Sequence, residues 1–262
     1  MGQEVWAAGD AYEPYVGRWS RLVARQFLDW LAVPAGCSWL DVGCGTGALS
    51  ERILAQATPA KVHGLDPSAG FVEYARSRVT DARARFGVAD ARDSGLEDAV
   101  FDAVVAGLVI NFVPQPEKAV AEMRRVARPG GVVAAYVWDY AGMMQLMRHF
   151  WNAAAALDPG ARELDEGRRF PICAPEALQE LFRSAGLNDV QTRAIDIVTH
   201  FRDFDDYWTP FLGGQAPAPG YAMSLTDERR ARLRERIREG LPFAIDGSIP
   251  LVARAWAVRG RK

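Results

Sequence analysis

Cysteine and histidine are scarce in this chain, which has three of each among its 262 residues. The cysteines, Cys37, Cys44 and Cys173, form an odd number, and neither their spacing nor a histidine partner matches a zinc site. The scarcity therefore predicts that the chain has no metal site and stays reduced, as in the cytoplasm.

The sequence also lacks an excess of one charge and a long apolar run. Its 31 basic side chains face 33 acidic ones, which gives no electrostatic argument for nucleic acid. No apolar run approaches the roughly 20 residues that span a bilayer. The first residues carry neither the basic nor the apolar region of a signal peptide. We therefore expect a cytoplasmic protein without nucleic-acid or membrane partners.

A glycine turn between a strand and a helix is the most informative segment that is present. The apolar run 38–42 predicts a strand, and glycines follow at positions 43, 45 and 47. Glycine has no Cβ and tolerates positive φ, so a ligand can approach the backbone of such a turn. The N-terminus of the following helix presents free N–H groups that suit negative charge.

A second acidic strand end supports a nucleoside site. Residues 61–65 predict the next strand, and Asp66 lies at its carboxyl end, about 20 residues past the glycines. That is the spacing at which an acidic residue meets a ribose hydroxyl in nucleotide-binding βαβ units. The glycine pattern is G-x-G-x-G, whereas a dinucleotide site has G-x-G-x-x-G. The spacing therefore disfavours a nicotinamide cofactor.

Strands and helices alternate along residues 36–139, which predicts a parallel sheet covered on both faces. The expected strands are 38–42, 61–65, 84–88, 101–107 and 131–138, and the expected helices are 46–56, 68–80 and 116–127. Ligands bind beyond the carboxyl ends of such strands. Four polar residues lie at these predicted ends, namely Asp41, Asp66, Asp90 and Asn111.

Several motifs together resemble the class I S-adenosylmethionine-dependent methyltransferases. They are Asp41 to Gly47, Gly64 to Ser68, Gly87 to Ala91, the strand from Phe101 with Val113 and Pro114 after it, and Arg124 to Gly131. The similarity is greatest to the small-molecule branch that includes enzymes methylating quinone rings, and it covers residues 36 to 140. It implies a Rossmann-like α/β fold: a mostly parallel seven-stranded sheet, an antiparallel edge hairpin and helices on both faces. Residues 190–201 and 251–258 suit the hairpin strands.

The resemblance implies S-adenosylmethionine as cofactor and S-adenosylhomocysteine as product. Asp90 would accept from the adenine amino group, the Ala91 N–H would donate to a ring nitrogen, and Val88 would contact the ring. Tyr15 and Arg18, in the N-terminal segment, are further candidates. The other expected cofactor-binding residues are Asp41, Gly43, Cys44, Gly45, Gly47, Asp66, Pro67, Ser68, Gly107 and Asn111.

Methyl transfer from a sulfonium mainly requires that the protein orient two substrates. A base is needed only when the nucleophile arrives protonated, so the catalytic residues are poorly constrained. The weak candidates are His149, Asp139, Tyr140 and His200, and packing or solvation also accounts for each. Aromatic and methionine residues outside the core favour a small apolar or aromatic acceptor. A nicotinamide-dependent oxidoreductase and a non-catalytic S-adenosylmethionine-binding protein remain alternatives.

The expected organisation is one globular domain in three stretches. Residues 1–35 form an N-terminal helical cap, 36–140 the cofactor-binding core, and 141–262 complete the sheet, with a helical insertion at about 203–249.

Helical additions at residues 12–19, 143–151 and 207–211 are expected to form a lid. Tyr12, Tyr15 and Trp19 either dock a helix on the sheet or fold over the cofactor, and a flexible linker at 213–220 would permit opening. The charged run from Thr226 to about Gly240 predicts an amphipathic surface helix more than a nucleic-acid patch.

Overall fold

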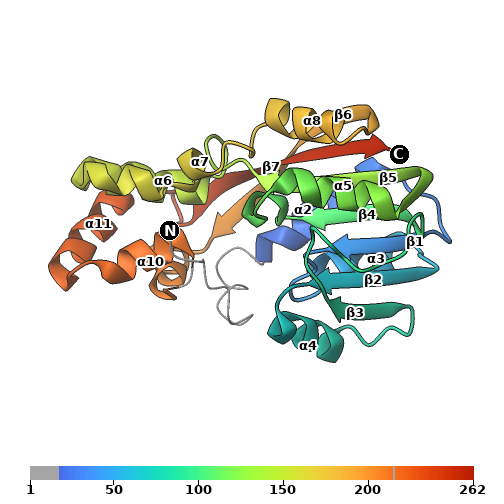
Figure 1. Cartoon of the computed structure of the whole chain (residues 1–262). Coiled ribbons are helices and arrows are strands. Elements are labelled where there is room, and N and C mark those ends of the chain that lie inside the picture. Colours follow the sequence, from blue (N-terminus) through green and yellow to red (C-terminus); the bar gives the residue numbers. More distant parts are fainter. Residues whose placement is uncertain (1–17, 215) are drawn as a thin grey trace. The chain divides into compact units, whose positions relative to one another are not determined.

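A seven-stranded sheet runs through the chain, with its strands in the order β3-β2-β1-β4-β5-β7-β6 (Figure 1). The computed structural model describes residues 18–214 and 216–262. The strands are β1 (Ser38–Val42), β2 (Lys61–Asp66), β3 (Ala84–Val88), β4 (Phe101–Gly107), β5 (Ala127–Trp138), β6 (Asn188–Phe201) and β7 (Ile249–Arg261).

Strands β1 to β5 pair in parallel, and their order reverses between β1 and β4. Asp41 of β1 lies opposite Gly64 of β2 on one side and Val105 of β4 on the other. Every residue of β1 is buried, as expected for a strand covered on both faces. Ligands of such sheets bind beyond the carboxyl ends of the strands at the reversal, which is where the glycine turn follows β1.

Strand β7 runs antiparallel to β5. The Gly130 N–H donates to the Lys262 carbonyl at 2.9 Å, and the Asp139 N–H donates to the Arg254 carbonyl at 2.9 Å, so residue numbers rise along β5 as they fall along β7. Strand β6 lies on the other side of β7, where Asp196 pairs with Arg254 at 2.6 Å. The predicted mostly parallel sheet with an antiparallel edge pair is confirmed.

Several helices form where apolar residues recur at helical spacing. In α2, Val23, Phe27 and Leu31 lie one turn apart and are buried. The helices and 3₁₀ turns are α2 (Arg18–Leu31), α3 (Ala48–Gln56), α4 (Ala69–Arg78), η2 (Ile110–Phe112), α5 (Pro116–Val126), α6 (Gln145–Leu157), η3 (Pro159–Leu164), α7 (Glu166–Arg169), α8 (Pro175–Ser184), α9 (Phe204–Trp208), η4 (Thr209–Leu212), α10 (Pro217–Ser224) and α11 (Asp227–Glu239). Within the described part of the chain, no helix has the length and apolar character needed to cross a membrane.

Contacts divide the chain into two compact units. The first, here the core unit, contains residues 20–137, 172–195 and 255–262. The second, here the helical unit, contains Arg18 and Trp19 with 138–171 and 196–254. The strand-end residues expected to bind the cofactor belong to the core unit. The three stretches expected from the sequence, and their assembly into one domain, stay a prediction.

Apart from shifts in the bounds of some elements, two segments differ from the sequence-based expectation. Part of the predicted linker 213–220 is helical, because α10 begins at Pro217. Proline suits the first turn of a helix, where its missing N–H would have had no intrahelical partner. Residues 159–169, for which no element was expected, form η3 and α7. The charged helix is confirmed as α11, with Thr226 as its N-cap accepting from the Arg229 N–H at 3.3 Å.

Candidate functional site

The turn after β1 contains three glycines with positive φ, at 69° for Gly43, 51° for Gly45 and 87° for Gly47. The N–H groups of Gly43 and Cys44 both donate to the Leu65 carbonyl, at 2.7 and 2.9 Å. The turn is therefore tied to the end of β2, and its left-handed backbone explains why glycine recurs at alternate positions.

The three glycines have different surroundings. A Cβ at Gly43 would lie 2.5 Å from a methyl carbon of Val109, and one at Gly47 would lie 3.1 Å from a methyl carbon of Val79. A Cβ at Gly45 would meet no atom within 4 Å. Gly43 and Gly47 therefore allow close packing, whereas Gly45 borders open space that a ligand can fill.

Asp66 organises the turn from the carboxyl end of β2. Its Oδ2 accepts from the Gly45 N–H at 3.0 Å, and its Oδ1 accepts from the Ser68 N–H at 2.9 Å. Burial raises the pKa of Asp66, and these two hydrogen bonds oppose that rise. A carboxylate offers about four acceptor positions. Asp66 therefore retains acceptor capacity for hydroxyl groups of a ligand.

Asp41 is a buried carboxyl group at the end of β1. Its Oδ2 accepts from the Ser50 hydroxyl at 2.7 Å, while its buried Oδ1 has no hydrogen-bond partner among the described residues. Burial raises the pKa of Asp41 to about 7, and the nearby charge of Asp66 adds to the rise. An unsatisfied buried acceptor is costly. A cationic or donor group of a ligand would relieve that cost.

Asp90 follows β3 and is held by Arg92. Its Oδ1 accepts from the backbone N–H and the Nε of Arg92 at 2.8 and 2.9 Å, and its Oδ2 accepts from Nη2 at 2.6 Å. These hydrogen bonds lower the pKa of Asp90 to about 2. Arg92 was not among the residues predicted from the sequence, although its position two residues after the aspartate was a usable signal.

The segment around Asp90 is fixed to β2. The Ala89 N–H donates to the Asp66 carbonyl at 3.2 Å, which brings two of the predicted strand ends together. Val88 is 56% exposed at the end of β3, and Ala91 is half-buried. An exposed apolar side chain beside two carboxylates suits a ligand that combines a flat ring with hydroxyl groups.

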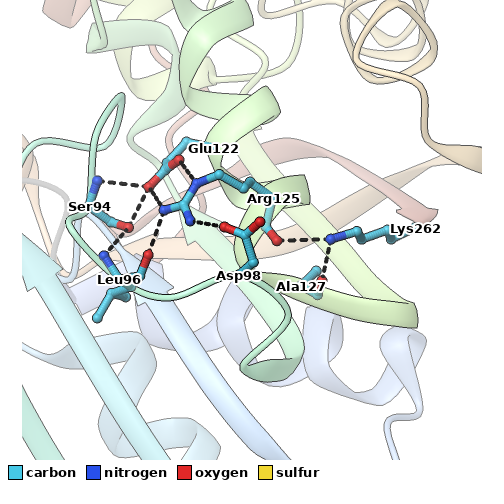
Figure 2. A network of polar contacts seen from close by, with 7 residues as sticks. All are labelled: Ser94, Leu96, Asp98, Glu122, Arg125, Ala127 and Lys262. Atoms are coloured by element: carbon cyan, nitrogen blue, oxygen red, sulfur yellow. Dashed lines mark hydrogen bonds and ion pairs between the residues drawn. The ribbon is translucent and has the colours of Figure 1, made fainter.

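A polar network holds the loop that follows Asp90, as Figure 2 shows. Glu122 of α5 accepts from the Ser94 N–H at 2.8 Å and from the Arg125 Nε at 2.6 Å. Arg125 also pairs with Asp98 and donates to the Leu96 carbonyl at 2.8 Å. Burial alone would raise the pKa of Glu122, but the hydrogen bonds from Arg125 and Ser94 outweigh it and bring the pKa to about 2.

Lys262 joins this network from the end of the chain. Its Nζ donates to the carbonyls of Arg125 and Ala127 at 2.8 Å each (Figure 2). A cation at the carbonyls that end a helix is favourable. Lys262 therefore secures the C-terminus of α5, the helix that supplies Glu122 and Arg125.

Two predicted residues lie at the end of β4 and after it. A Cβ at Gly107 would lie 2.6 Å from the hydroxyl of Tyr136, so this glycine makes room for a core side chain. Asn111 is buried, and its Nδ2 has no hydrogen-bond partner among the described residues. Its role at the cofactor stays a prediction.

Pro67 and Ser68 lie between β2 and α4. Pro67 is exposed, and the Ser68 hydroxyl accepts from the Phe71 N–H at 3.3 Å as the N-cap of α4.

Cys44 is buried within the glycine turn. Burial raises the pKa of its thiol, and the carboxylates of Asp41 and Asp66 add to the rise, so it is no ready thiolate.

The four weak catalytic candidates all belong to the helical unit. Burial lowers the pKa of the half-buried His149, so its imidazole is neutral at pH 7. His200 is exposed on β6. The Asp139 carboxylate accepts from the N–H groups of Gly142 and Met143 at 3.0 and 2.9 Å, which shapes the turn before α6. Tyr140 is buried. Their catalytic roles stay predictions.

Arg18 begins α2, and its Nη1 binds Asp206 at 3.0 Å. Its guanidinium lies over the rings of Trp19 and Phe201, 4.4 and 4.8 Å from their centroids. In the structure, Arg18 therefore contacts one carboxylate and two aromatic rings. A contact between Arg18 and the cofactor stays a prediction. Tyr12 and Tyr15 lie outside the described residues.

Across residues 18–214 and 216–262, no three histidine, cysteine or acidic side chains are grouped as a metal site.

Comparison with known proteins identifies the family. The "Methyltransferase domain" family matches residues 40–135. The 2-methyl-6-phytyl-1,4-hydroquinone methyltransferase of Synechocystis is 31% identical over 63% of this chain, which spans only 50% of that protein. The demethylmenaquinone methyltransferase of Roseiflexus is 30% identical over 64% of this chain and 75% of that protein.

A solved structure shares the fold. It is the phosphoethanolamine N-methyltransferase 2 of Haemonchus contortus with S-adenosyl-L-methionine, with a TM-score of 0.60 and 18% identity over 97% of this chain and 56% of that one. This chain belongs to the class I S-adenosylmethionine-dependent methyltransferases.

Proposed function

We propose that this protein transfers the methyl group of S-adenosylmethionine to a small, apolar or aromatic organic acceptor. The observation that carries the proposal is the turn after β1, where Gly45 borders open space beside the carboxylate of Asp66. The names of the two relatives given above describe methylation of a hydroquinone and of demethylmenaquinone, which favours a ring acceptor.

The residues present fit the cofactor. The turn from Gly43 to Gly47 would hold its methionine part, Asp66 would accept from the ribose hydroxyls, and the unsatisfied Oδ1 of Asp41 suits a cationic group. Asp90 and Ala91 would read the adenine, with Val88 against the ring. When bound, the cofactor supplies an electrophilic methyl group with a neutral thioether as leaving group.

The protein's own contribution is to bind and orient the two substrates, which can supply roughly 7–11 kcal/mol of the barrier. A phenolic or hydroquinone acceptor loses a proton during transfer to oxygen, so a neutral base near it would help. His149 has the protonation state for that role, because burial keeps its imidazole neutral. Its catalytic role stays a prediction.

Family membership disfavours a nicotinamide-dependent oxidoreductase, as does the G-x-G-x-G spacing. The cytoplasmic location and the absence of nucleic-acid and membrane partners remain predictions.

Thermal unfolding with candidate cofactors tests the proposal first. A ligand that binds only the folded state raises the melting temperature. We expect a rise with S-adenosylmethionine and S-adenosylhomocysteine, and none with NAD or NADP. Methyl-labelled S-adenosylmethionine with phenols, hydroquinones and amines then separates an enzyme from a non-catalytic binder. Stabilisation by NAD instead would contradict the cofactor, and transfer to amines alone would contradict the acceptor class.

A further inference from the structure

The tripeptide Asp-Ala-Arg occurs twice, once on each side of β3. In the first copy, Asp81 accepts from the backbone N–H and Nε of Arg83 through Oδ1, at 2.9 and 3.0 Å, and from Nη2 through Oδ2 at 2.7 Å. In the second copy, Asp90 and Arg92 make the same three contacts at 2.8, 2.9 and 2.6 Å. The arginine fork is therefore a local property of this tripeptide.

The two copies differ in what surrounds them. The first precedes β3, and Arg83 also donates to the carbonyls of Leu54 and Pro59 at 3.5 Å each. The second follows β3, at the edge of the sheet where Asp66 and the glycine turn lie. Only the second copy can affect a ligand at that edge, and the first provides a natural control.

The hydrogen bonds from Arg92 limit what Asp90 can accept. A carboxylate has about four acceptor positions, two on each oxygen. Two donors of Arg92 occupy Oδ1, and one occupies Oδ2. A single position on Oδ2 therefore remains for a ligand.

We propose that Arg92 is a positioning residue for adenine recognition, because it turns Asp90 so that one acceptor position on Oδ2 faces the amino group of the base. This inference rests on the proposed cofactor, S-adenosylmethionine. A guanidinium holds a carboxylate through two parallel N–H bonds and fixes its plane, which a lysine cannot do.

Other hydrogen bonds already fix the backbone around Asp90. Arg92 therefore restricts the rotation of the Asp90 carboxylate. The Ala89 N–H is bonded to the Asp66 carbonyl, and the Ser94 N–H is bonded to Glu122 at 2.8 Å. The Asp90 side chain itself is 45% exposed. Without Arg92, a half-exposed carboxylate would rotate and present either oxygen to the base.

Binding calorimetry with the full-length protein tests this role. The probes are S-adenosylhomocysteine and its analogue with unsubstituted purine in place of adenine, which lacks the amino group and keeps the ring nitrogens as acceptors. We expect the wild type to prefer the adenosine compound by roughly tenfold or more, as for one charge-assisted hydrogen bond. Arg92→Ala should lose most of that preference, while its affinity for the purine analogue changes less than about twofold.

Three further variants make the result specific. Arg83→Ala removes the matched fork before β3 and should keep the wild-type preference. Arg92→Lys retains the charge without the fork and should resemble Arg92→Ala. In an Asp90→Ala background, which has no preference to lose, adding Arg92→Ala should change neither affinity.

A full preference in Arg92→Ala or Arg92→Lys would overturn the positioning role. So would an equal loss in Arg83→Ala, or an effect of Arg92→Ala that persists without Asp90, since Arg92 would then act on the ligand or the fold directly. Failure of the wild type to bind S-adenosylhomocysteine would instead contradict the proposed cofactor.

Discussion

Single side chains at the carboxyl ends of β1, β2 and β3 form the proposed cofactor site. Asp66 holds the glycine turn through Gly45 and the start of α4 through Ser68. Asp66→Ala removes the predicted ribose acceptor together with both of these bonds. We expect S-adenosylmethionine to bind more weakly by roughly 1.5–3 kcal/mol, the range for hydrogen bonds to a charged group. Calorimetry with Asp66→Ala measures this loss, and an unchanged affinity would refute the assignment.

Gly45 offers a test with a matched control. Gly36 also has positive φ, at 79° against 51° for Gly45, and a Cβ at either position meets no atom within 4 Å. Alanine should therefore cost each position roughly 1–2 kcal/mol of backbone strain. Gly45→Ala should also weaken cofactor binding about tenfold or more, because its Cβ enters the ligand space, whereas Gly36→Ala should not. Equal cofactor affinities in the two variants would show that the turn does not hold the cofactor.

The residues that sequence reasoning found share one property: their positions follow from periodicity. A strand that ends in aspartate next to a glycine turn places Asp41 and Asp66 at one edge without any knowledge of side-chain contacts. Arg92, for which we propose a positioning role, was missed because its contacts with Asp90 do not follow from periodicity. The same tripeptide around Arg83 shows that the motif alone does not distinguish a functional site from a local turn.

At the level of elements, the network around Glu122 fastens the loop between β3 and β4 to α5 (Figure 2). The pKa of Glu122 is lowered to about 2, so its stabilising effect is complete above the unfolded pKa of about 4.3 and is lost as pH falls towards 2. Glu122→Gln should lower the free energy of unfolding at pH 7 by roughly 1–3 kcal/mol. The variant should also lose less stability than the wild type between pH 5 and pH 3.

Urea unfolding across that pH range provides the measurement. Glu117→Gln, an exposed position on the same helix, controls for the loss of one carboxylate. If the two variants have the same stability profile, the network does not hold the loop.

The elements predicted accurately are those with a regular pattern of buried apolar residues. Strand β4 is a continuous apolar run, and its bounds, Phe101–Gly107, match the prediction. Helix α10 was missed because its proline and glycine content is typical of linkers, whereas in a first turn proline is tolerated. Strand β5 begins at Ala127 instead of residue 131, next to a register shift against β4 between Phe101 and Ala103. Composition does not reveal such a shift.

For the whole molecule, the sequence predicted the sheet and the family, and left the acceptor site open. The expected lid involves Tyr12 and Tyr15, which lie outside the described residues, and helices of the helical unit. The amphipathic pattern of such helices shows that one face is buried but does not tell which surface buries it. The lid therefore stays a prediction.

The stability of the whole molecule should depend on pH through two opposing groups of carboxylates. Asp90 and Glu122 have lowered pKa values, so they add stability as pH rises from about 2 to about 4. Asp41 and Asp66 have pKa values raised by burial, so the folded state holds protons that the unfolded chain has released. Their contribution makes the free energy of unfolding fall as pH rises from about 4 towards 7. The protein without cofactor should therefore have its highest melting temperature near pH 4.

Cofactor binding should oppose the fall in stability that the protein without cofactor shows as pH rises from about 4 towards 7. A cationic group beside Asp41 favours the ionised carboxylate, so S-adenosylhomocysteine should raise the melting temperature more at pH 8 than at pH 5. Asp41→Asn removes the buried charge, and should flatten the decline between pH 5 and pH 8 in the protein without cofactor while weakening cofactor binding. Melting curves of both proteins, with and without S-adenosylhomocysteine, measure the two effects together. An equal rise at both pH values would show that the unsatisfied oxygen of Asp41 does not meet the cation.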